Sequence, residues 1–143
     1  MISIRYVYGV NKHNNKYLNI LNELDDKIFP DDDRAKKQGS YWWIAFNKNK
    51  EPIGFGGLRI FFGKIATFTR AGVLKEYRGK GIHKRLIRVR EKMARKLGIQ
   101  KIVTYVAKFN LDSANNLIKD GFQLYKPSYE YGLKNAFYLI KEL

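Results

Sequence analysis

The chain has 143 residues, 45% of them hydrophobic and 15% aromatic, and it carries a formal net charge of +15. This length and apolar content fit a single folded domain spanning residues 1–143 and argue against a largely disordered chain. There is no cysteine, and the two histidines, His13 and His83, lie far apart, so the sequence excludes disulfides, thiolate metal sites and a cysteine nucleophile, and we expect no metal.

No apolar stretch approaches the roughly 20 residues that a membrane-spanning helix needs. The N-terminal segment lacks the basic start, apolar core and small-residue cleavage site of a signal peptide. We therefore expect a soluble, cytoplasmic protein with no membrane partner.

The period of the apolar residues predicts the elements of the first half. Alternation over residues 2–8 predicts a strand. Tyr17, Leu21, Leu24 and Ile28 share one helical face, with Asn14 or Asn15 as the cap and Pro30 as the break. Strands follow over residues 40–46, 52–62 and 65–73, the last two joined by a turn at 63–64. The segment 33–37 is compatible with a further short helix.

From Gly81 the period becomes helical, with one apolar stripe formed by Ile82, Leu86, Val89, Met93 and Leu97. Gly98 ends this helix. A buried type of strand is expected over residues 101–106, a helix over 111–119, and two last strands over 122–125 and 136–140. The order β-α-β-β-β-α-β-α-β-β predicts an α/β fold, a mixed sheet with helices packed on it.

Charge is distributed unevenly along the chain. Residues 23–33 hold six acidic side chains against one base, Lys27, whereas residues 75–108 hold twelve Lys or Arg against Glu76 and Glu91. The basic stretch suits a polyanion, such as a phosphorylated cofactor, a nucleic acid or both, and it equally suits a solvated helix face. It has few interleaved aromatic residues, which argues against binding of single strands.

The most informative segment joins the strand over 65–73 to the basic helix. Gly79 and Gly81 allow a ligand to approach the backbone closely, and the first N–H groups of the helix have no internal acceptor. Arg78, Lys80 and Lys84 add positive charge. The segment therefore predicts a phosphate site. The dinucleotide pattern G-x-G-x-x-G is absent, because Lys84 replaces the third glycine.

Two motifs here resemble those of the GNAT superfamily of acyl-CoA-dependent N-acyltransferases. The run Val73-Leu74-Lys75-Glu76-Tyr77-Arg78-Gly79-Lys80-Gly81-Ile82 is similar to the acyl-CoA loop, whose pattern is [Q/R]-x-x-G-x-[G/A], with His83 in the final small position. Asn110, Ser113 and the closing Gly121-Phe122 resemble the N-x-x-[S/A] helix of that family. The resemblance implies the GNAT-like fold, in which two central strands splay apart.

The resemblance also implies roles for individual residues. The main chain of Ala71, Gly72 and Val73 would pair with the pantetheine arm and the acetyl carbonyl of acetyl-CoA, the co-substrate. Asn110, with Ser113 in the same motif, would contact the pantetheine or adenosine half. The pyrophosphate would bind the loop and helix start: Arg78, Gly79, Lys80, Gly81, Ile82, His83 and Lys84.

The sequence departs from the family where catalysis is expected. Leu117 stands where many relatives have a tyrosine acid, and Tyr105 stands where some have a glutamate base. Proximity and orientation could supply much of the rate, because a thiolate leaves readily, and a water chain could deprotonate the amine. Tyr105 is the best candidate for an acid or proton relay, and its competing role is a core aromatic.

Four other residues have both a functional and a structural interpretation. Arg70 interrupts an apolar strand, where it either binds an acidic group of the acceptor or faces solvent. Trp42 and Tyr125 either wall an acceptor pocket or pack within the fold. His83 either donates to a phosphate or relays a proton, or it has only a structural role in the first turn of the helix.

We expect an N-acetyltransferase that moves an acetyl group from acetyl-CoA to a primary amine by direct attack in a ternary complex. The net charge of +15 keeps two alternatives open. One is an amine borne by nucleic acid, in aminoacyl-tRNA or a modified base. The other is a non-catalytic module that binds CoA or nucleic acid. The sequence fixes neither the acceptor nor the choice between monomer and homodimer.

Overall fold

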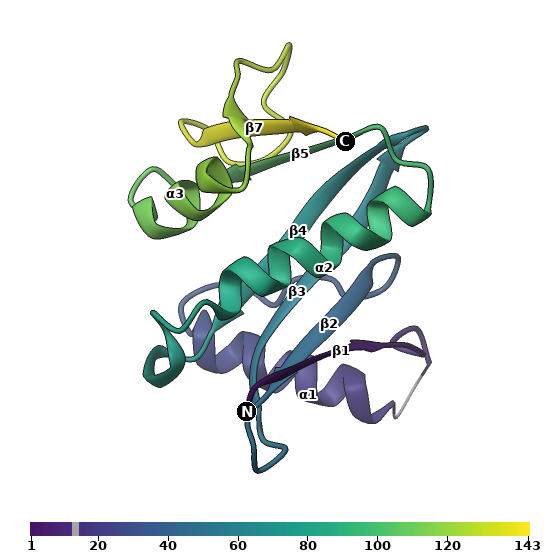
Figure 1. Ribbon diagram of the computed structural model, residues 1–143, viewed down its shortest axis with the longest axis vertical. Helices are drawn as coiled ribbons and strands as arrows, with labels where there is room; N and C mark the ends of the chain where they lie inside the picture. Colours follow the sequence, from purple (N-terminus) through teal and green to yellow (C-terminus); the bar gives the residue numbers. More distant parts are fainter. Residues whose placement is uncertain (13–14) are drawn as a thin grey trace.

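A computed structural model describes residues 1–12 and 15–143 of the chain. It contains one seven-stranded mixed sheet in the order β1-β2-β3-β4-β5-β7-β6, with α1 on one face and α2 and α3 on the other (Figure 1). The helices are α1 (Lys16–Ile28), α2 (Ile82–Lys96) and α3 (Leu111–Lys119). The strands are β1 (Ser3–Val7), β2 (Tyr41–Phe46), β3 (Pro52–Phe62), β4 (Ile65–Val73), β5 (Lys101–Val106), β6 (Gln123–Leu124) and β7 (Phe137–Glu142).

The expected order of elements is confirmed, with differences at the ends. A single 3-10 turn, η1 (Lys75–Tyr77), is added after β4, and β6 is only two residues long. Asn15 caps α1, because its side-chain oxygen accepts the N–H groups of Tyr17 and Leu18 at 2.9 and 3.3 Å, whereas Asn14 lies outside the described residues. The further short helix with which residues 33–37 were compatible does not form, and this segment is an irregular connection.

Neighbouring tryptophans show how the sheet separates two cores. Trp42 packs with Leu21 and Leu24 of α1, while Trp43 belongs to the core under α2. This follows from the two-residue period of a strand, which sends adjacent side chains to opposite faces. Both faces of β2 are thereby covered.

The two central parallel strands separate after a short contact. β4 and β5 pair only through Ile65 with Lys101, Ala66 with Ile102 and Thr67 with Val103. Beyond Thr67, β4 continues beside β3 and β5 continues beside β7. The splay predicted from the sequence is therefore present, and the edge of β4 that faces β5 is left without strand partners over residues 68–73.

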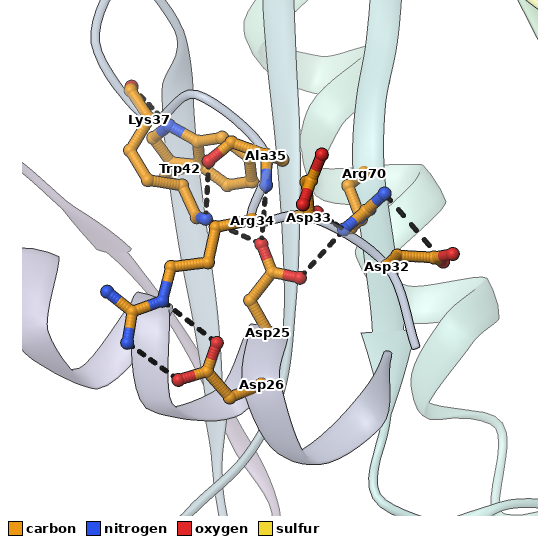
Figure 2. A network of polar contacts seen from close by, with 9 residues as sticks. All are labelled: Asp25, Asp26, Asp32, Asp33, Arg34, Ala35, Lys37, Trp42 and Arg70. Atoms are coloured by element: carbon orange, nitrogen blue, oxygen red, sulfur yellow. Dashed lines mark hydrogen bonds and ion pairs between the residues drawn. The ribbon is translucent and has the colours of Figure 1, made fainter. Parts of the chain in front are cut away.

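A bulge in β4 lies just past this separation. Leu58 pairs with Phe68 and Gly56 pairs with Ala71, so Thr69 and Arg70 together oppose the single residue Gly57. An extra residue of this kind changes the face to which the following side chain points. Arg70 therefore lies on the α1 face of the sheet, where it contacts α1 (Figure 2).

A buried ion cluster holds the 29–40 connection against β4 (Figure 2). The carboxylate of Asp25, on α1, lies 2.6 Å from Lys37 Nζ and 2.9 Å from Arg70 Nη1, and it accepts the N–H of Ala35 at 2.9 Å. Asp25 and Lys37 are both almost completely buried. Burial alone would raise the pKa of Asp25, but the hydrogen bonds from Lys37, Ala35 and Arg70 outweigh it and lower the pKa.

We predict that Asp25→Asn lowers the free energy of unfolding by about 3–5 kcal/mol, because it leaves the buried ammonium of Lys37 without its counter-charge. Urea unfolding at pH 7 measures this. The matched control is Asp26→Asn on the same helix, which breaks the exposed pair with Arg34 and should change stability little. Equal effects of the two substitutions would contradict the structural role of the buried cluster.

Candidate functional site

A cavity of about 700 Å³ lies beside the end of β4, beyond the residues that pair with β5. One wall is the end of β4, and the rest is formed mainly by the start of α2 and by α3. Ile28 and Phe29 close it from the α1 side. The cavity is lined by residues that the sequence predicted, which are Ala71, Gly72, Val73, Arg78, Gly79, Gly81, Ile82, His83, Lys84, Asn110 and Ser113.

Two glycines shape the floor of the cavity. Gly79 and Gly81 have φ values of +78° and +79°, a left-handed conformation that other residues rarely adopt. Apart from the adjacent residues of the loop, no atom lies within 4 Å of the position that a Cβ would take at either residue. The backbone of this loop is therefore open to a ligand.

The start of α2 has the electrostatics of an anion site. Gly81 is the N-cap and offers no side-chain acceptor, so the first N–H groups of the helix are free to bind an external anion. Lys84 and Arg78 line the same space. Arg78 also donates from Nε to the carbonyl of Val73 at 3.1 Å, which ties the loop to the end of β4.

His83 joins the start of α2 to the middle of α3. Its Nδ1 lies 3.1 Å from the amide nitrogen of Asn116. Because that nitrogen can only donate, the ring accepts at Nδ1 and carries its proton on Nε2. Burial, with a smaller contribution from the charge of Arg90, lowers the pKa of His83 to about 4. The imidazole is therefore neutral near pH 7.

α3 supplies a polar wall with a simple pattern. Asn110 caps the helix by accepting the N–H of Ser113 at 3.3 Å. Asn116 comes three residues after Ser113 and also lines the cavity. This residue was missed in the sequence, although a spacing of three places it on the same helical face. Phe109 lines the cavity while 90% exposed, and no sequence pattern pointed to it.

Other candidates lie outside this cavity. Lys80 is exposed on the loop but is not part of the lining. Tyr105 packs against Tyr131 and Tyr138, with ring centroids 6.2 and 5.7 Å away. The hydroxyl groups of Tyr125 and Tyr131 are 2.5 Å apart. Tyr105 and Tyr125 thus belong to an aromatic cluster beside β7.

The structure corrects two interpretations. Trp42 is completely buried against Phe55 and donates its indole N–H to the carbonyl of Lys37, so it cannot wall an accessible pocket. Arg70 is not free to bind an acceptor. It is engaged by Asp25, by the carbonyl of Asp33 at 2.8 Å and by the ring of Phe29.

Comparison with known families agrees with this geometry. Residues 10–122 match the model of the acetyltransferase (GNAT) family. The chain belongs to that GNAT family. A search of curated proteins by sequence found no match.

Solved structures of GNAT proteins share the fold over the whole chain. An IAA acetyltransferase from Bacillus cereus is 18% identical, with a TM-score of 0.76 and complete coverage of both chains. A Bacillus subtilis acetyltransferase in complex with CoA is 18% identical, with a TM-score of 0.76 and coverage of 100% and 99%. A GNAT acetyltransferase from Elizabethkingia anophelis with acetyl-CoA bound is 17% identical, with a TM-score of 0.73 and coverage of 99% and 98%.

Two further findings concern membrane-spanning helices and metal sites. Among the described residues, no helix is both long and apolar enough to cross a membrane. In the same part of the chain, no three His, Asp or Glu side chains gather in a way that could hold a metal ion. Family membership supports acetyl transfer as the general chemistry of this GNAT protein.

The half-buried His83 predicts a pH effect on stability. The unfolded chain protonates this ring near the ordinary pKa of 6.5, and the folded protein does so only near 4. The free energy of unfolding that the neutral ring contributes is therefore fully present above pH 6.5 and is lost as the pH falls toward 4. Between pH 7 and pH 5, the wild type should lose about 2 kcal/mol more unfolding free energy than His83→Gln. Identical pH dependence of the two proteins in urea unfolding would contradict a ring that stays neutral in the folded state.

Proposed function

We propose that this GNAT protein is an acetyl-CoA-dependent N-acetyltransferase that transfers the acetyl group to a primary amine by direct attack in a ternary complex. The observation that supports this most is the cavity at the splay of β4 and β5, which ends at the uncapped start of α2. It joins a site for a diphosphate to an exposed strand edge.

The residues present fit the parts of CoA. The pyrophosphate carries two negative charges, and the free N–H groups of Ile82, His83 and Lys84 at the helix start suit it. The open left-handed turns at Gly79 and Gly81 allow close approach. Lys84 adds a cation at the same place. Asn110, Ser113 and Asn116 offer polar groups along the opposite wall.

The edge of β4 is suited to hold the thioester. Its main-chain groups over residues 68–73 have no partner on β5. A pantetheine arm laid along Ala71, Gly72 and Val73 could pair with them as a strand would. A main-chain N–H there could also stabilise the negative charge that develops on the carbonyl oxygen when the amine attacks.

Positioning supplies most of the catalysis in this proposal. Among the described residues that line the cavity, Asp112 is the only carboxylate, and it lies in the first turn of α3 rather than on β4. The amine nitrogen forms the new bond to the carbonyl carbon, and the carbon–sulfur bond then breaks. The proton lost by the nitrogen passes to water, and the thiolate takes up a proton from solvent.

Calorimetry with CoA and a CoA-release assay over a panel of amines test the proposal separately. We expect CoA to bind at tens of micromolar or tighter, about −6 kcal/mol, and at least one amine to release CoA from acetyl-CoA. Binding without release for any amine would favour a non-catalytic CoA-binding module. No binding in this range would refute the site.

A matched pair of glycine substitutions locates the binding site. Gly81→Glu places a negative charge at the proposed diphosphate site and should weaken CoA binding about a hundredfold. Gly63→Glu, in the turn between β3 and β4, meets the same kind of backbone strain and equally open space. Its affinity for CoA should stay within about twofold of the wild-type value, because its charge lies outside the cavity. Equal losses for both variants would mean that strain, rather than the site, is being measured.

A further inference from the structure

The outward face of α2 carries a continuous row of cations, which we call the basic ridge. Its members are exposed side chains spaced three or four residues apart along the helix, or directly adjacent: Lys84, Arg85, Arg88, Lys92, Arg95 and Lys96. At 3.6 residues per turn, these six positions fall within an arc of about 120° around the helix, so they share one side. At 1.5 Å per residue, the ridge is about 18 Å long.

No acidic side chain neutralises the ridge within the described residues. The cations held in ion pairs there are Arg34, Lys37, Arg70 and Lys141. The one acidic residue of α2, Glu91, is buried and faces Lys141 rather than solvent. The ridge therefore concentrates the positive charge of a chain whose net charge is already +15.

We propose that the basic ridge binds the phosphate backbone of a nucleic-acid duplex. A row of exposed cations on a rigid helix complements a regular line of phosphates and releases the counterions condensed on it. No aromatic side chain lies on the ridge to stack on bases. Binding is accordingly independent of sequence and does not require single strands.

An anionic membrane is the less suitable partner for this surface. A helix that lies in a membrane interface inserts its apolar face between the lipids. The apolar face of α2 is instead buried in the core of the protein through residues that include Ile82, Leu86 and Ile87. What α2 offers to the outside is charge, which suits a phosphate backbone.

Fluorescence anisotropy with a labelled 20-base-pair DNA duplex and a matched RNA duplex, without CoA, tests the proposal. If all six cations contact phosphates, affinity should fall roughly a thousandfold between 50 and 200 mM salt. The variant Arg88→Gln/Lys92→Gln/Arg95→Gln removes three of them and keeps good helix-forming residues. Its affinity should fall only about fortyfold over the same range.

The control variant removes the same amount of charge elsewhere. Lys16→Gln/Lys27→Gln/Lys48→Gln changes exposed residues of α1, on the other face of the sheet, and of the turn before β3. It should keep the steep salt dependence of the wild type. Both variants should bind CoA as the wild type does, because none of these residues lines the cavity, and this separates a lost ridge from a lost fold.

Three results would overturn the proposal. The first is no binding of either duplex at 50 mM salt. The second is an equal loss in the ridge and control variants, which would assign binding to net charge alone. The third is binding to phosphatidylserine vesicles but not to the duplexes. None of these outcomes depends on acetyl transfer, so the proposed enzymatic function is tested independently by the CoA-release assay.

Discussion

The brief contact between β4 and β5 is the constraint on which the site depends. Only three residue pairs join these strands, and the backbone groups of β4 beyond Thr67 then need other partners, because buried main-chain groups are rarely left unpaired. An extended ligand laid into the gap would supply them. Beside the end of β4, α2 and α3 are joined through His83 and Asn116.

Charge is divided between the two faces of the sheet. On the α1 face, the acidic segment is fastened to β4 by Asp25, Lys37 and Arg70 (Figure 2). This buried ion cluster holds the segment that contains Phe29, whose ring lies against Gly72 at the cavity wall. On the other face, α2 presents cations to solvent. Removing one partner of such a buried pair is costly, because the other charge is left uncompensated.

Much of this architecture followed from local patterns. The element order and the two glycines before α2 were predictable because apolar periodicity and left-handed turns are properties of short segments. The partners of Arg70 were not, because its contact with Asp25 joins residues far apart in sequence and depends on the bulge at Thr69. Trp42 shows the same limit: its exposure depends on how α1 packs over β2, which the strand pattern does not reveal.

Amide chemical shifts measured by NMR during a CoA titration test the central claim most directly. The account predicts that the largest changes fall on residues 79–84, with further changes at Asn110, Ser113 and Asn116. A second hollow of about 370 Å³ lies beside Tyr6 and Tyr41, and the amide chemical shifts of the residues that line it should not change. Unchanged amides at residues 79–84, or changes centred on that second hollow, would contradict the assignment of the cavity.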